Sequence, residues 1–68
     1  MEKLKELRKK NNLTNQKMGE LLGVSKVFYW QLENNKRRIS YDMAYKISQI
    51  FNVKPDDIFY DETKTKIK

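Results

Sequence analysis

The stretch Asn15-Gln16-Lys17-Met18-Gly19-Glu20-Leu21-Leu22-Gly23-Val24-Ser25-Lys26-Val27-Phe28-Tyr29-Trp30-Gln31-Leu32 decides the fold of this 68-residue chain. Two helices that cross steeply through a short turn need a small residue at the crossing, and Gly19 fills that place. Four residues later the chain has to reverse with a positive φ, and Gly23 does so without a Cβ penalty. The residues that have to point into the crevice between the helices are all apolar: Met18, Leu22, Val24, Tyr29 and Leu32. The stretch therefore predicts two helices joined by a tight turn.

Serine and threonine residues mark the starts of three helices. A hydroxyl oxygen placed just before a helix can accept from N–H groups of the first turn that have no partner within the helix. The residues placed to do so are Thr14, Ser25 and Ser40. The helix after Thr14 is predicted to stop at Gly23, the next to cover about residues 25–34, and the one after Ser40 to end at Asn52.

Two further helices complete an all-α, five-helix domain. Residues 2–10 are rich in Glu, Lys and Leu, with Leu4 and Leu7 on one face of the predicted helix. Pro55 suits the first position of a short fifth helix, because its missing N–H costs nothing there. We therefore expect one domain over residues 1–60 and a polar, solvated tail over residues 61–68.

Composition excludes several classes of function. The chain has no Cys and no His, so disulfides, thiolate metal sites and most nucleophile–base pairs are not available to it. We expect no enzymatic activity, no cofactor, no metal and no small-molecule ligand. The apolar runs are too short for a membrane span or a signal peptide, which predicts a cytoplasmic protein without a membrane partner. Residues 1–54 contain twelve Lys and Arg residues but only five Asp and Glu residues, and this excess of positive charge favours a polyanionic partner.

The chain resembles the Cro and phage-repressor (Xre) family of helix-turn-helix proteins from about Leu4 to Phe59. The residues that carry the resemblance are, in order, Leu13-Thr14, Leu22-Gly23-Val24-Ser25, Leu32-Glu33-Asn34, Lys36-Arg37, Val53 and Asp57-Ile58-Phe59. It implies a compact five-helix fold of the lambda-repressor-like type and sequence-specific binding to double-stranded DNA. The chain departs from the family at Gly19, where Ala is usual, and at Asn35 and Asn52, where glycines are usual. Asn tolerates the left-handed conformation better than most residues.

The resemblance also implies which residues contact DNA bases. Lys26, Val27 and Gln31 match the family's base-contact positions. Lys can donate to guanine O6 and N7, Gln can grip adenine with two hydrogen bonds, and Val can pack on a thymine methyl group. The alternative is that these residues form ordinary exposed surface. Phe28 and Trp30 either contact DNA, cover a neighbouring helix or face a partner chain.

Phosphate contacts are expected at two places. Asn15 and Gln16 begin the first helix of the motif, where the resemblance and the helix dipole both favour a phosphate. The second place is the polar loop after the second helix of the motif, the recognition helix, with Asn34, Lys36, Arg37 and Arg38. For this loop the alternative is a solvated run of charges.

Arg8 and Glu33 correspond to positions that form an interior ion pair in similar proteins. Such a pair, if buried, fixes the relative orientation of two helices more than it adds stability. The alternative is two exposed charges.

Together these features predict a transcriptional regulator that binds a palindromic operator as a homodimer and occludes or recruits polymerase. Phage or mobile-element repressors and controller proteins of restriction–modification systems are the most similar types. The dimer contact is expected at Ile58, Phe59 and Tyr60, of which Ile58 and one ring are expected to close the core. Both rings could instead pack within their own subunit. The alternative function is a protein-interaction module, antitoxin-like or an adaptor, that uses Phe28 and Trp30.

Overall fold

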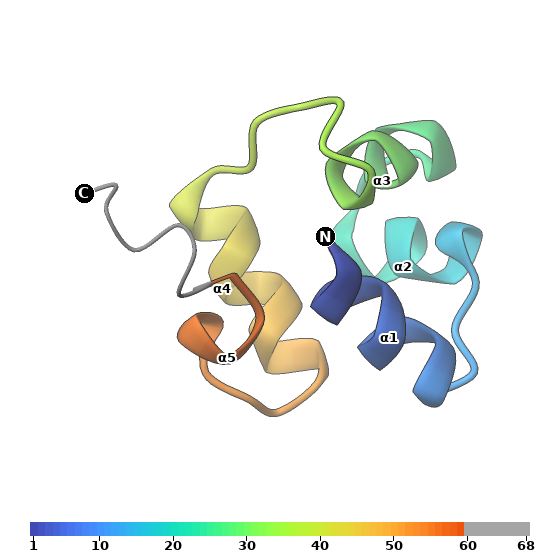
Figure 1. Ribbon diagram of the computed structural model, residues 1–68. Helices are drawn as coiled ribbons and strands as arrows, with labels where there is room; N and C mark the ends of the chain where they lie inside the picture. The colour runs from blue at the N-terminus through green and yellow to red at the C-terminus, as the bar shows by residue number, and fades with distance from the viewer. Residues whose placement is uncertain (60–68) are drawn as a thin grey trace.

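A computed structural model describes residues 1–59, and over that range the chain forms five helices and no strand (Figure 1). The helices are α1 (Glu2–Lys10), α2 (Asn15–Leu22), α3 (Lys26–Glu33), α4 (Tyr41–Ile50) and α5 (Pro55–Phe59). The predicted all-α, five-helix class is confirmed. Tyr60 and the predicted tail lie outside the described residues.

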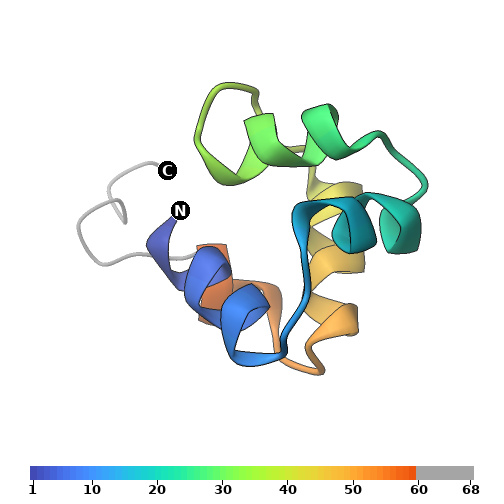
Figure 2. The same ribbon diagram turned by 90° about the vertical axis from the view of Figure 1, so that its right-hand side faces the viewer.

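The five helices share one core. α2 packs on α3 and α4 packs on α5, while α1 contacts both α3 and α5, and α2 contacts α4. In Figure 1, α4 and α5 lie on the left and α1, α2 and α3 on the right; Figure 2 shows α5 behind α1. The buried side chains at the centre come from every helix: Leu4, Met18, Leu22, Tyr29, Ile47 and Ile58. Each helix is therefore held by a side chain in the common core.

The helices begin where hydroxyl side chains can cap them. The side-chain oxygen of Thr14 accepts from the N–H of Lys17 at 3.0 Å, and Ser25 and Ser40 accept in the same way from residues three positions further on. The three predicted caps are thus confirmed. The short helix α5 begins differently, because the N–H of Lys54 donates to the carboxylate of Asp57 at 3.1 Å.

The ends of α1 to α4 share one backbone geometry. Each is followed by a residue with positive φ: Asn12 (57°), Gly23 (75°), Asn35 (59°) and Asn52 (56°). The next N–H then donates to the carbonyl five residues earlier, as from Val24 to Gly19 at 2.8 Å. This pattern is the Schellman motif, and it satisfies carbonyls that the helix leaves without a partner. The left-handed conformation expected at Gly23, Asn35 and Asn52 is present, and Asn12 adds a fourth.

Gly19 stands at the closest approach of α2 to the turn before α3. A Cβ atom at this position would lie 2.7 Å from the carbonyl oxygen of Val24 and 3.1 Å from the backbone of Ser25. Both neighbours are backbone atoms, which cannot rotate away as a side chain can. The departure from the family's usual Ala therefore has a steric reason. The cost of this close approach is the roughly 1 kcal/mol by which a glycine inside a helix is less favourable than Ala.

A buried carboxylate joins α1 to α3. The side chain of Glu33 is 1% exposed and accepts from Nε of Arg8 at 2.8 Å and from Nη2 at 3.1 Å. It also accepts from the hydroxyl of Tyr29 at 3.0 Å. A third donor of Arg8, Nη1, reaches the carbonyl oxygen of Leu13 at 2.9 Å. Both carboxylate oxygens thus have partners, which is the condition under which a buried charge is tolerated.

We expect Arg8→Ala to lower the free energy of unfolding by about 3–5 kcal/mol, because it leaves the carboxylate of Glu33 buried without a counter-ion. The matched control is Lys17→Ala, which breaks the exposed Lys17–Glu20 pair at 3.9 Å. That exposed pair is expected to contribute less than about 1 kcal/mol. Urea unfolding of the two variants compares them directly. Equal losses would contradict a structural role for the buried pair.

The same network predicts a loss of stability in alkali. Burial, and then the negative charge of Glu33, raises the pKa of Tyr29 well above its ordinary value of 10.0. Above pH 10.0 the unfolded chain loses the Tyr29 proton while the folded chain keeps it. The contribution of this group to the free energy of unfolding is therefore complete below pH 10.0 and falls by about 1.4 kcal/mol per pH unit as the pH rises above 10.0.

Tyr29→Phe is expected to remove this alkaline slope, although it also loses the hydrogen bond to Glu33 and so about 1 kcal/mol at neutral pH. Urea unfolding below and above pH 10.0 measures the slope for each protein. Tyr41→Phe is the control, because Tyr41 is 76% exposed and meets water in both states. If Tyr41→Phe changes the slope as much as Tyr29→Phe does, Tyr29 is not the cause of the alkaline loss of stability.

Candidate nucleic-acid interface

The first residues of α3 face solvent. Lys26 is exposed and Val27 is 62% exposed, whereas Tyr29, Leu32 and Glu33 of the same helix are buried. One side of α3 is thus fixed in the core and the other is free for a ligand. Two of the three predicted base-contact residues lie on this free side, and Gln31, one turn further along, is half-buried.

Charge is distributed unequally over the helix N-termini. The first turns of α1, α4 and α5 contain acidic residues, which offset the positive end of the helix dipole. The first turns of α2 and α3 contain none. The two helices of the motif therefore keep an uncompensated positive end, and α3 adds the ammonium group of Lys26 to it. This arrangement favours an anion at both N-termini.

Asn15 and Gln16 lie in the first turn of α2, as predicted. The Oδ1 atom of Asn15 is buried and has no hydrogen-bond partner among the described residues. Its Nδ2 atom, which can only donate, is the end of the amide that can meet an acceptor such as a phosphate oxygen. Gln16 is exposed, and its amide donates weakly to Glu20 at 3.5 Å.

The four phosphate contacts predicted at the loop after α3 differ in their surroundings. The Nδ2 atom of Asn34 donates to the carbonyl oxygen of Trp30 at 2.9 Å, so this side chain is engaged at the end of α3. Lys36 and Arg38 are exposed. Figure 1 shows this loop running from α3 across one end of the molecule to α4.

Arg37 turns back onto α3. Its guanidinium carbon lies 4.3 Å from the centre of the Phe28 ring, and its Nε donates to Oε1 of Gln31 at 3.0 Å. The sequence indicated each of these three residues but not that they form one cluster. The contacts depend on how the loop returns, which no spacing in the sequence reveals.

Exposed aromatic residues occur on two helices. Trp30 is 43% exposed on α3, while Tyr41 and Tyr45 are 76% and 48% exposed on α4. Sequence analysis missed the two tyrosines, although their spacing of four, beside the buried positions of α4, places them on one face of the helix. Leu21 on α2 is also exposed.

The predicted dimer residues divide between core and surface. Ile58 is buried in the chain's own core, and Phe59 is half-buried against that core. Tyr60, the third residue of this group, is not among the described residues.

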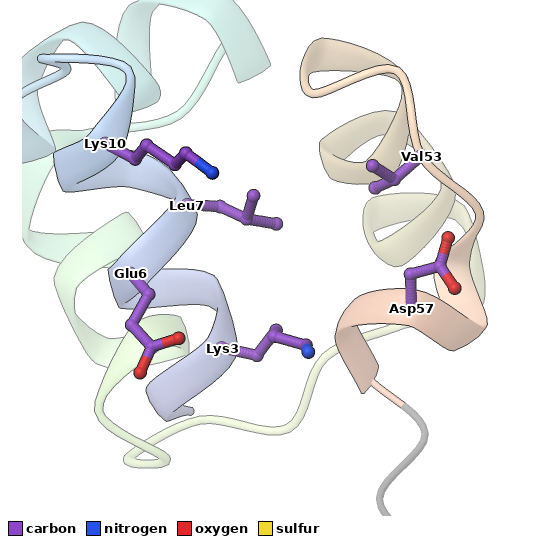
Figure 3. A pocket seen from close by; sticks show the side chains of 6 residues that line it. All are labelled: Lys3, Glu6, Leu7, Lys10, Val53 and Asp57. Atoms are coloured by element: carbon purple, nitrogen blue, oxygen red, sulfur yellow. The ribbon is translucent and has the colours of Figure 1, made fainter.

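A hollow of about 380 Å³ lies between α1 and the segment from the end of α4 to α5 (Figure 3). The residues that line it are Lys3, Glu6, Leu7, Lys10, Val53 and Asp57, so the lining contains both positive and negative charges. Asp57 already accepts from the backbone of Lys54. In residues 1–59 no cluster of side chains is suited to a metal ion, and no helix is long and apolar enough to cross a membrane.

Comparison with known proteins identifies the motif. The helix-turn-helix domain family matches residues 1–62. An uncharacterized HTH-type transcriptional regulator of Archaeoglobus fulgidus is 39% identical over 61 residues, which are 88% of this chain and 86% of the relative. One of Methanocaldococcus jannaschii is 40% identical over 60 residues, 88% of this chain and 91% of the relative.

A longer relative shares the same region. A putative HTH-type transcriptional regulatory protein of Pyrococcus furiosus is 38% identical over 61 residues, but these are only 19% of its length. No solved structure matches the chain significantly. The tight turn between α2 and α3, the family match over residues 1–62 and the two relatives of similar length agree, and the chain belongs to the helix-turn-helix domain family.

Proposed function

We propose that this helix-turn-helix protein is a cytoplasmic transcriptional regulator that binds a palindromic DNA operator as a homodimer. The observation that carries the proposal is the free N-terminal side of α3, which has no acidic residue in its first turn and carries the exposed Lys26 and Val27. An α-helix of this kind fits the major groove of B-DNA. The names of the archaeal relatives, HTH-type transcriptional regulators, support the same role. It is a binding function and not an enzymatic one.

Base contacts are assigned to α3. Lys26 donates to guanine acceptors, Val27 packs on a thymine methyl group, and Gln31 contacts the base edge one turn further on. The exposure of Lys26 and Val27 is consistent with this assignment. Phe28 is occupied by Arg37, so among the aromatic residues of α3 it is Trp30 that can meet DNA or a partner.

Contacts to the sugar–phosphate backbone flank α3 on both sides. On one side the N-terminus of α2 offers Asn15 and Gln16. On the other side the loop offers the exposed Lys36 and Arg38, whereas the side chains of Asn34 and Arg37 hydrogen-bond to residues of α3. Such contacts fix the register of a protein on the duplex and supply most of its salt-dependent affinity.

A homodimer is proposed because one short helix reads few base pairs. Two linked copies contact half-sites about one helical turn apart, and the operator takes on the two-fold symmetry of the protein. The surface proposed for the contact is the end of α5, with Phe59 and Tyr60. Ile58 supports it from the core.

A second candidate function is a protein-interaction module, antitoxin-like or an adaptor. The exposure of Trp30, Tyr41 and Tyr45 favours it, because exposed aromatic groups are frequent at protein interfaces. A regulator can use such a surface as well, so DNA binding itself separates the two functions.

We expect selection from a random duplex pool to enrich a palindromic sequence. Binding to that sequence is expected to weaken as salt is added, with a slope of log K against log salt of about −0.9 for each phosphate contact. Gel-shift titrations at several salt concentrations measure both properties. A pool that stays random, or binding that ignores salt, would favour the protein-interaction function. Enrichment of a single half-site would argue against the homodimer.

Matched variants separate the two kinds of DNA contact. Lys26→Ala is expected to cost about 1–3 kcal/mol against the selected site and to relax the preference at particular base pairs. Arg38→Ala is expected to weaken binding to all sequences alike and to reduce the salt slope by about one for each phosphate that it no longer neutralises. Both residues are exposed, so circular dichroism should find both variants folded. If the two variants behave identically, the division into base and backbone contacts is wrong.

A further inference from the structure

The path of the loop after α3 places Arg37 beside Gln31. Asn35 has a φ of 59°, and this turn lets the N–H of Lys36 donate to the carbonyl oxygen of Gln31 at 2.8 Å. The chain reverses there, and the next side chain returns along α3. The side chain of Arg37 is exposed, but its direction is set by the way in which α3 ends.

Two contacts hold the guanidinium group in place. It lies over the face of Phe28, with 4.3 Å from its carbon to the ring centre, a distance typical of cation–π contacts. Its Nε donates to Oε1 of Gln31 at 3.0 Å. Together the ring face and the hydrogen bond restrict the guanidinium to the surface beside Phe28 and Gln31.

This hydrogen bond also decides which way the amide of Gln31 faces. A guanidinium group has five N–H donors and no acceptor, so the amide atom next to Nε has to be the oxygen. The amide nitrogen, Nε2, is then the atom available to a base. The Nη groups of Arg37 remain as further donors beside it. The surface formed by the two side chains is thus a set of donors.

From this geometry we infer that Arg37 and Gln31 together recognise guanine, with Arg37 as a specificity-determining residue and Phe28 as its positioning residue. The inference rests on the proposed function and deepens it. Guanine presents two acceptors in the major groove, O6 and N7, whereas adenine presents the N6 amino donor and the N7 acceptor. A set of donors complements guanine, and the amino group of adenine would meet the guanidinium donors.

This assignment differs from what the two residues would do separately. A free glutamine offers one donor and one acceptor and matches adenine. An arginine on a solvated loop would contact a phosphate and add affinity without base preference. The contact between Arg37 and Gln31 changes both roles at once, because it turns the glutamine's acceptor oxygen toward Arg37, occupying one of its two lone pairs, and holds the arginine against the recognition helix.

The experiment uses the sequence enriched by the wild-type protein, and measures binding to duplexes that differ only at the base pair contacted by Gln31. That base pair is the one whose preference Gln31→Ala abolishes. We expect wild type to prefer guanine over adenine there by about tenfold or more. Replacement by 7-deazaguanine, which lacks N7, is expected to weaken binding, while inosine, which keeps O6 and N7, is expected to bind like guanine.

Three variants test the role of Arg37. Arg37→Ala is expected to lose the guanine preference, or to exchange it for adenine, at this base pair alone. Phe28→Leu keeps an apolar side chain but removes the ring face, so it is expected to reduce the same preference with Arg37 still present. Arg38→Ala, the control on the same loop, is expected to leave the preference unchanged. Circular dichroism establishes that each variant is folded.

Two results would overturn the inference and leave the proposed function intact. One is a uniform loss of affinity in Arg37→Ala with the base preference unchanged, which would make Arg37 a phosphate contact. The other is adenine at the base pair contacted by Gln31 in the wild-type site. If wild type enriches no sequence at all, the proposed function fails, and the guanine assignment fails with it.

Discussion

Glu33 carries a carboxylate into the interior at the end of α3, and the rest of the structure is arranged to satisfy it. Arg8 reaches it from α1 with two donors, and Tyr29 reaches it from one turn earlier in α3. A buried charge without such partners would cost several kcal/mol, so α3 cannot slide or rotate away from α1 without a large penalty. The raised pKa of Arg8, caused first by its hydrogen bond to Glu33, has the same origin. Because the buried side of α3 is fixed in this way, the direction of its exposed side is fixed as well.

The second constraint acts on the other side of α3. The carbonyl of Val24 comes so close to Gly19 that no side chain fits there, and Gly23 turns the chain with a φ of 75°. These residues set the distance and the crossing of α2 and α3. The buried ion pair sets the position of α3 relative to α1. Together they place the N-termini of α2 and α3, the two without acidic residues, on one rigid frame.

Local features of the structure were predictable from the sequence, and features that join distant segments were less so. The caps Thr14, Ser25 and Ser40 depend on backbone groups within three residues, so their chemistry is visible in the sequence. The left-handed turn at Asn35 followed from the position of a usual glycine. The pairing of Arg8 with Glu33 came from resemblance, since 25 residues separate them and no local rule links them.

Side-chain contacts across the loop could not be predicted. Arg37 was grouped with Lys36 and Arg38 because the three form one basic run, and only the folded chain distinguishes it by its contact with Phe28. The hydroxyl of Tyr29 was likewise missed, because the residue was assigned only as an apolar core residue, although its partner Glu33 lies one helical turn further on. In both cases the decisive atom lies at the end of a long side chain, where several rotamers fit the same backbone.

The way in which the helices end has a consequence for how quickly the chain folds. In α1 to α4 the turn that stops each helix is formed by residues within about six positions of each other, and in α2, α3 and α4 the cap that starts it is equally local. Such segments can form and dissolve on their own on a scale of about a microsecond. Few contacts then remain that require distant parts of the chain to meet. These contacts join α1 to α3 and, across a still longer stretch of chain, α1 to α5, so the closure of these loops, and not helix formation, is the step expected to limit the folding rate.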